Sequence, residues 1–251
     1  MSGRRHRAGL VACALLVALT GCGRAGTATP PAHWVTPSAA PSAASRVDSC
    51  LPSAGAHRLA GTGPTAVLLG KGAKGVLLTP DQGRGICQWL SFGRLLVGRG
   101  YHVLIWDPGS DPVAEAGVLV DRLKAAGAKR VALMGAGAGA DISIFLTAGG
   151  KPGIGGLVWL SGNETLAATG EPVEPKVKQL KVPVLFVASR ADFNGAAVLA
   201  GRLHDLLPTA QQQKVLAIPG DQRGVALLTG PYRDRVLPIL FDDLSHWTST
   251  G

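Results

Sequence analysis

The fold is decided by the ten residues from Val131 to Ala140, which read Val-Ala-Leu-Met-Gly-Ala-Gly-Ala-Gly-Ala. The first four residues form an apolar run that is typical of a buried strand, and the alternating glycines and alanines after them open a helix. Glycine tolerates the tight turn that such a junction needs. The stretch therefore predicts a strand, a sharp turn and a helix, which together are the repeating unit of an α/β fold.

The same unit recurs along the chain at an even interval. Six apolar runs end 27, 28, 26, 28 and 30 residues apart, at Thr79, Trp106, Met134, Leu160, Ala188 and Ile218. An interval of this length holds one strand and one crossover helix. Continuously apolar strands are typical of a parallel sheet that is covered on both faces.

The segments between the runs support this fold class. Apolar residues recur at helical spacing over 113–123 and 199–206, and a last helix is expected over 231–242. One or two antiparallel edge strands are expected over 57–69. The interval 160–182 has little periodicity and no room for a lid. The sequence thus predicts an α/β domain with a mostly parallel, doubly wound sheet and no lid domain.

The first 47 residues predict an export signal followed by a tether. Residues 1–21 carry three arginines and then an apolar stretch too short to span a bilayer, which is the layout of an export signal. Leu-Thr-Gly-Cys22 resembles a bacterial lipobox, whose cysteine is acylated and becomes the first residue of the mature chain. An ordinary cleaved signal with a chance cysteine is the alternative. Residues 22–47, rich in Ala, Pro, Ser and Thr, predict a disordered tether, and 48–247 form the domain.

This interpretation places the protein on the outer face of the cytoplasmic membrane, anchored by lipid on Cys22. Cys13 leaves with the signal, so two cysteines remain in the domain, Cys50 and Cys87. In an oxidising compartment we expect a disulfide between them. Two separate buried thiols are the alternative.

Composition and charge exclude several classes of protein. Hydrophobic residues make up 46% of the chain and charged residues 16%, which excludes wholesale disorder. The formal net charge is +9, but three of the basic residues lie in the export signal. The remaining basic residues form no run and do not alternate with aromatic residues, so we expect no nucleic-acid binding.

Two interpretations of the glycine-rich turn are open. Gly135, Gly137 and Ala140 fit the G-x-G-x-x-A fingerprint of a dinucleotide site, but the turn follows a middle strand and no ribose-binding acid ends the next one. Gly135 and Gly139 also flank residue 137 as in a G-x-nucleophile-x-G elbow, where a strained turn presents a nucleophile above a helix. The rest of the chain favours the elbow.

From about Cys50 to Trp247 the chain resembles the α/β-hydrolase family, especially small lidless members exported by actinobacteria. Besides the elbow, the resemblance rests on three segments in the family's order: Arg-Gly-Tyr-His-Val-Leu-Ile-Trp-Asp107, Val-Pro-Val-Leu-Phe-Val-Ala-Ser-Arg-Ala-Asp192 and Ile-Pro-Gly-Asp-Gln-Arg-Gly224. It implies a nucleophile at position 137, an acid at Asp192 and a histidine base at position 223.

The chain departs from the family at two of these three positions. Gly137 has no side chain to attack a carbonyl, and Arg223 stays protonated and cannot act as a general base. Only the acid, Asp192, is kept. The triad is therefore degenerate, with no intact catalytic set. We expect Asp192 and Arg223 to form an ion pair, and an Arg223 that points to solvent is the alternative.

The oxyanion region departs from the family as well. The turn after the first apolar run contains Pro80, which has no N–H to donate. Asp81 follows, and its carboxylate would oppose a developing anion even if its N–H were a donor. Ala138 supplies the other backbone N–H, so Asp81 and Ala138 form an oxyanion-like pair.

The other chemistry-bearing residues give no second site. Four serines are weighed as replacement nucleophiles, without a suitably placed histidine: Ser110, Ser143, Ser161 and Ser189. No His, Cys and Asp cluster has metal-ligand spacing, and we expect neither a metal nor a cofactor.

Two features of the carboxyl ends of the predicted strands favour ligands of opposite charge. The N-terminus of the elbow helix favours an anion. Four carboxylates at strand ends favour a cation or an amine instead: Asp81, Asp107, Asp192 and Asp221. Three arginines are expected to neutralise them: Arg84, Arg190 and Arg223.

The sequence leads to one main expectation for function and two rivals. The main one is a catalytically inactive, membrane-anchored lipoprotein with an α/β-hydrolase fold, which acts as a binding or scaffold module for a small molecule or a cell-envelope ligand. A weak serine-type esterase or peptidase with a non-standard nucleophile is the first rival. A structural cell-envelope lipoprotein is the second.

Overall fold

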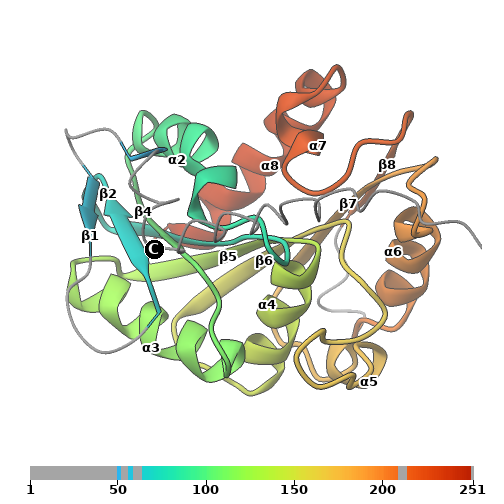
Figure 1. Cartoon of the computed structure of the whole chain (residues 1–251), viewed down its shortest axis with the longest axis horizontal. Coiled ribbons are helices and arrows are strands. Elements are labelled where there is room, and N and C mark those ends of the chain that lie inside the picture. The colour runs from blue at the N-terminus through green and yellow to red at the C-terminus, as the bar shows by residue number, and fades with distance from the viewer. Residues whose placement is uncertain (1–49, 52–55, 59–63, 209–213, 250–251) are drawn as a thin grey trace, which may run out of the picture. The chain divides into compact units, whose positions relative to one another are not determined.

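A central eight-stranded sheet organises the part of the chain that the structure describes (Figure 1). The structure is a computed structural model and describes residues 50–51, 56–58, 64–208 and 214–249. The predicted export signal, Cys22 and all of the predicted tether lie outside these residues. The strands are β1 (Ala56–Arg58), β2 (Ala66–Leu69), β3 (Lys74–Thr79), β4 (Tyr101–Trp106), β5 (Arg130–Ala136), β6 (Ile154–Leu160), β7 (Val184–Ser189) and β8 (Val215–Ile218).

The sheet is mostly parallel, as the sequence predicts. The strand order is β1-β2-β4-β3-β5-β6-β7-β8. The six strands from β3 to β8 are parallel, and β2 pairs antiparallel with β4 and with β1. The segment 57–69 thus supplies the expected antiparallel edge. All six parallel strands point their carboxyl ends at one edge, which gathers the loops after them into one region.

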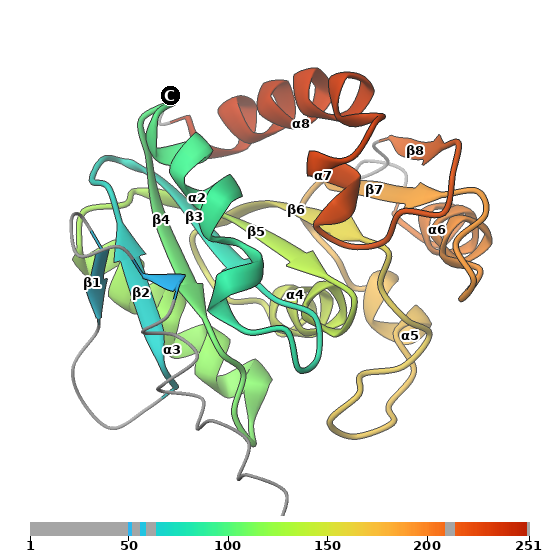
Figure 2. The same cartoon turned by 45° about the horizontal axis from the view of Figure 1, so that its top comes forward.

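Helices cover both faces of the sheet (Figure 2). One layer contains α2 (Leu90–Val97), α7 (Ala226–Thr229) and α8 (Arg233–Thr248), and the other contains α3 (Pro112–Ala125), α4 (Ala138–Ala148), α5 (Glu174–Val177) and α6 (Ala196–Asp205). A short 3₁₀ turn, η1 (Ile86–Gln88), precedes α2.

Alternation along each strand divides the core between these two layers. Leu77 and Leu133 pack with the α3–α6 layer, whereas their neighbours Val76 and Met134 pack with the α2, α7 and α8 layer. All four side chains are buried. Successive strand residues point to opposite faces, so a strand covered on both sides must be apolar throughout.

The boundaries differ from the prediction in a few places. β5 continues two residues beyond Met134, because its ladder runs past the last strongly apolar residue. α8 begins two residues later and ends six residues later than predicted, and Leu244 and Trp247 are buried in its last turns. The segment between β6 and β7 holds only α5 and an isolated bridge between Thr165 and Pro172, so no lid domain lies there.

The predicted disulfide is confirmed. Cys50 and Cys87 are bonded, with their Cα atoms 5.7 Å apart. Cys87 lies in η1, so the bond ties the start of the domain to the loop between β3 and α2. Among the described residues, no helix has the length and hydropathy that crossing a membrane requires.

Candidate functional site

The glycine-rich turn forms a sharp elbow between β5 and α4. Gly137 has φ +52° and ψ −123°, a conformation that side chains strongly disfavour, and it caps the N-terminus of α4. The two glycines that flank it are required because backbone atoms lie too close to them for any side chain to fit. A Cβ on Gly135 would overlap the backbone of Gly139, and a Cβ on Gly139 would overlap the Thr79 carbonyl of β3. The local geometry is that of the predicted elbow.

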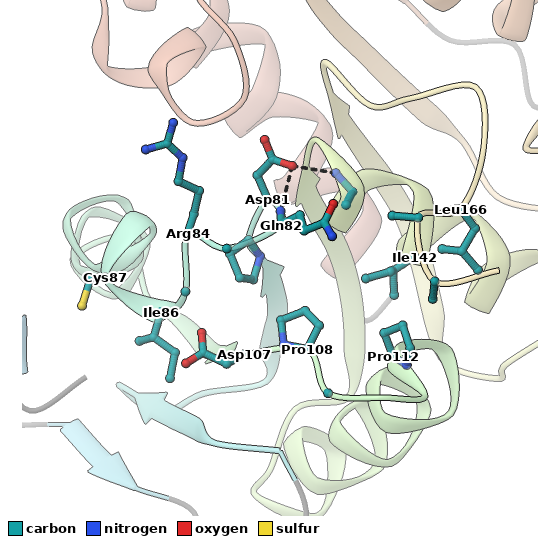
Figure 3. Close-up of a pocket in the computed structure, with 17 residues that line it drawn as sticks. Asp81, Gln82, Arg84, Ile86, Cys87, Asp107, Pro108, Pro112, Ile142 and Leu166 are labelled. Carbon is teal, nitrogen blue, oxygen red and sulfur yellow. Dashed lines mark hydrogen bonds between the residues drawn. The ribbon is translucent and has the colours of Figure 1, made fainter. Parts of the chain in front are cut away.

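The carboxylate of Asp81 fills this elbow (Figure 3). Its Oδ1 accepts the N–H of Ala138 at 2.9 Å and the N–H of Gln82 at 2.8 Å. A Cβ built on Gly137 would overlap the same carboxylate. Asp81 therefore occupies the space that a nucleophilic side chain at residue 137 would need. It also holds the Ala138 N–H, which an oxyanion would use.

The second backbone donor of the expected oxyanion-like pair is also occupied. The N–H of Asp81 donates to Oε1 of Gln88 at 3.0 Å. The expectation that Asp81 and Ala138 present their N–H groups to a ligand is therefore wrong, because both groups bind acceptors of the chain itself. The hydrogen bond between the Asp81 carboxylate and the Ala138 N–H also argues against the dinucleotide interpretation, because a phosphate at this helix N-terminus would meet a carboxylate.

Asp192 and Arg223 meet at the ends of β7 and β8. Nη1 of Arg223 donates to both carboxylate oxygens of Asp192, at 3.1 and 3.2 Å. The Asp192 side chain is fully buried, and the Arg223 side chain is 16% exposed. Asp192 also accepts the N–H of Asn194 at 2.9 Å. The expected ion pair is thus present, and Arg223 does not point freely to solvent.

Two residues that the sequence analysis did not place in the site extend this pair inward. Nη2 of Arg223 donates to Oδ1 of Asn163 at 2.8 Å. Asn163 in turn donates through its backbone N–H and its Nδ2 to Asp141, at 3.0 and 2.8 Å. Asp141 lies on α4, four residues after Gly137, so a polar chain links α4 to the ends of β6, β7 and β8.

Burial raises the pKa of Asp141 to about 7, while hydrogen bonds from Asn163 and Trp159 and the charge of Arg223 limit the rise. The groups of Asn163 and Trp159 that bind its carboxylate are all donors, which suits the ionised form. The signal in the sequence was a single charged residue within an otherwise apolar helix. For Asn163, the informative feature of the sequence is its position shortly after the predicted strand that ends at Leu160.

A cavity of about 370 Å³ opens beside Asp81, at the carboxyl ends of β3 and β4 (Figure 3). Its wall is largely apolar and is formed by Pro80, Ile86, Pro108, Pro112, Ile142 and Leu166. Asp81, Gln82, Arg84 and Asp107 contribute its polar side chains. The disulfide residue Cys87 also lies on its rim. Neither Asp192 nor Arg223 lines this cavity, so the ion pair that they form is not part of its wall.

Three of the other predicted charges, Arg84, Arg190 and Asp221, have no ion pair within the described part of the chain. Arg84 and Arg190 form no ion pair with a described residue, so of the three arginines only Arg223 neutralises a carboxylate. Asp221 is exposed and accepts from Gln222 at 2.9 Å. Within the described ranges, no group of three or more His, Cys, Asp or Glu residues is placed to hold a metal ion.

The candidate replacement nucleophiles are poorly placed for attack. Ser110 is exposed, and the hydroxyl of Ser143 donates to the Gly139 carbonyl at 2.9 Å. Ser161 and Ser189 are buried, and their hydroxyls have no partner among the described residues. Ser161 is also the one non-glycine residue of the described chain with a positive φ, at +47°. None of the described histidine side chains lines the cavity.

Comparison with solved structures shows a shared fold. Dienelactone hydrolase from Anabaena variabilis has a TM-score of 0.64 at 14% identity, covering 77% of this chain and 98% of its own. Est1E from Butyrivibrio proteoclasticus has a TM-score of 0.63 at 14% identity, covering 76% and 100%. The esterase Pf2001 from Pyrococcus furiosus has a TM-score of 0.62 at 14% identity, covering 74% and 86%. No protein-family model and no curated protein sequence matches the chain.

Proposed function

We propose that this chain, which has the α/β-hydrolase fold, is a catalytically inactive binding protein whose cavity beside the elbow holds a small molecule. The observation that carries the proposal is the position of the Asp81 carboxylate. It lies in the nucleophile's space above Gly137 and accepts the Ala138 N–H. Acyl transfer needs an activated nucleophile, a base and free donors for the oxyanion. These positions instead hold a glycine, an arginine and a bound carboxylate.

The position of the base supports the same proposal. Arg223 is held by Asp192 and Asn163 through three hydrogen bonds. A guanidinium in this setting remains a cation and accepts no proton. There is no histidine at this position to be oriented. The polar chain of Asp141, Asn163, Arg223 and Asp192 acts instead as a structural link between α4 and the last two strands.

The proposal includes an anchor. We expect lipid on Cys22 to hold the domain at the outer face of the cytoplasmic membrane, with residues 22–47 as its tether. Cys22→Ser should release the full chain from the membrane fraction of a lipoprotein-exporting bacterium. A Cys22→Ser chain that stays with the membrane would contradict this part of the proposal.

The experiment for inactivity treats the full chain, with Cys22→Ser to keep it free of lipid, with a fluorophosphonate probe and short-chain activated esters. An esterase of the same fold serves as the positive control. We expect no labelling and no turnover above buffer. A variant that combines Gly137→Ser, Arg223→His and Asp81→Gly supplies a nucleophile, a base, and both the space for the nucleophile and a free Ala138 N–H. Fluorophosphonate label on residue 137 of this variant would support the assignment of the elbow. Labelling or turnover by the natural sequence would overturn the proposal.

A weak hydrolase remains the second candidate because the solved structures with this fold include esterases and a dienelactone hydrolase. Ser161 is the residue it would need, since it combines a strained backbone with an unpartnered hydroxyl next to the elbow. Its side chain is fully buried, so a substrate would reach it only after the site opens. Mass-spectrometric mapping of a fluorophosphonate adduct separates the candidates, because only this one predicts an adduct on Ser161.

A further inference from the structure

The cavity beside the elbow has lost its hydrogen-bond donors at the helix N-terminus. The N–H groups of Asp81, Gln82 and Ala138 are the donors that a carbonyl or a carboxylate of a ligand would meet there. All three already donate within the chain, to Gln88 and to the Asp81 carboxylate. An anionic ligand would have to displace a carboxylate from these groups, and a carbonyl ligand finds no donor left among them.

An acceptor has taken their place. Oδ1 of Asp81 takes both backbone hydrogen bonds, and Oδ2 accepts none from the described residues. Asp81 is half-buried, lines the cavity and forms no ion pair in the described part of the chain. The N-terminus of α4 stabilises its negative charge. An unneutralised carboxylate therefore lies at the edge of the apolar space.

Besides Asp81, the polar side chains of the lining are those of Gln82, Arg84 and Asp107. Arg84 is exposed, and its side chain extends away from the apolar wall that includes Pro108 and Pro112 (Figure 3). Asp107 also lines the cavity and has an interaction of its own. The space, about 370 Å³, lies at the lower end of the usual range for small-molecule sites.

We propose that the cavity binds a small primary amine with an apolar body, whose ammonium group donates to Asp81 while the body packs on Pro108, Ile142 and Leu166. The inference rests on the proposed binding function and names its ligand class. It reverses the polarity of an oxyanion site, because the elbow offers an acceptor where such a site offers donors. A charge-assisted hydrogen bond to a carboxylate is among the stronger polar contacts in proteins.

The test compares three probes of similar shape, phenethylamine, phenethyl alcohol and phenylacetate, on the full chain carrying Cys22→Ser. Ligand-observed NMR titration at neutral pH measures their dissociation constants. We expect phenethylamine to bind about tenfold more tightly than the alcohol, which corresponds to about 1.4 kcal/mol. Phenylacetate should bind more weakly than the alcohol, because it meets a like charge.

Three variants locate the effect. Asp81→Asn keeps the size of the side chain and an oxygen for the Ala138 N–H, and it should bring the amine to within about twofold of the alcohol. Asp121→Asn, an exposed aspartate paired with Lys151, is the matched control and should leave the preference unchanged. Ala167→Trp fills the cavity from an exposed lining position and should weaken binding of both probes about tenfold or more.

Each other outcome overturns the inference. Phenylacetate binding as tightly as the amine would show that free donors remain. A preference that survives Asp81→Asn, or amine binding unaffected by Ala167→Trp, would place the amine elsewhere. Absence of binding by all three probes at millimolar concentration would reject this ligand class. None of these results depends on fluorophosphonate labelling, so failure of the inference and failure of the proposed inactivity are read separately.

Discussion

Combining Gly137→Ser with Asp81→Ala should cost the fold little more than Gly137→Ser alone. The two changes act on one volume, because a Cβ on Gly137 overlaps the Asp81 carboxylate. A serine at this elbow expels the carboxylate from its place above α4. Once it has left, the side chain of Asp81 no longer holds the Ala138 N–H, and its removal has little further effect.

The magnitudes follow from the contacts. Asp81→Ala removes the acceptor for the first N–H of α4, which costs about 1 kcal/mol, with about 0.5 kcal/mol more for the lost charge at the helix N-terminus. Gly137→Ser forces a side chain to φ +52° at about 1–3 kcal/mol and also loses that same capping interaction. The single changes should therefore cost about 1–2 and about 2–5 kcal/mol. The double change should again cost about 2–5 kcal/mol.

The assay is a double-mutant cycle on the free energy of unfolding, measured by guanidinium titration of the oxidised chain. We expect the double variant to be about 1–2 kcal/mol more stable than the sum of the single changes predicts. Gly137→Ser with Asp121→Ala is the control pair, and it should be additive because Asp121 lies at a distant exposed site paired with Lys151. Equal denaturant slopes would show that the comparison holds for one unfolding transition. Additivity of the test pair within about 0.5 kcal/mol would refute the placement of Asp81 in the elbow.

Three further predictions concern the polar chain and the disulfide. Because burial raises the pKa of Asp141 to about 7, the contribution of this residue to stability declines as pH rises from about 4 to about 7. The unfolding free energy of wild type relative to Asp141→Asn should therefore fall over that range and then level off. A difference that does not change with pH would contradict this prediction. Arg223→Met leaves the buried Asp192 carboxylate unpaired and should cost about 3 kcal/mol in denaturant titrations, part of which Asp192→Asn should recover. Cys50→Ser with Cys87→Ser opens a 37-residue separation and should lower the unfolding free energy by about 4 kcal/mol; wild type in reductant should match it.

The layers and the strand positions could be predicted from the sequence because both depend on local pattern. A strand buried on both faces has to be apolar at every position, and each crossover needs a nearly constant length. The predicted ends of β3, β4, β6 and β8 therefore agree with the structure, and those of β5 and β7 lie within two residues of it. The apolar pattern therefore predicts where a strand lies more accurately than it predicts the residue at which the strand ends.

The site could be predicted only in part, since its contacts are between residues far apart in the chain. The pairing of Asp192 with Arg223 followed from the family order of segments, which places both at neighbouring strand ends. Asp81 and Ala138 were found, but their relation was not, because the carboxylate reaches across 57 residues to the helix. A turn sequence indicates which groups are near an elbow and does not determine which rotamer fills it.

Asp81 and Gly137 are best understood as two halves of one change under the proposed function. A helix N-terminus with free N–H groups has an unmet demand for an anion, and a catalytic site keeps that demand open until a substrate develops charge. Such openness lowers stability, which is the usual conflict between a strained active site and a stable fold. Here the loop after β3 supplies a permanent anion through Asp81, and a glycine at 137 is what lets it fit. Restoring a side chain at 137 without removing Asp81 would sacrifice the cap and leave a displaced carboxylate beside the elbow, so we expect the two positions to change together or not at all.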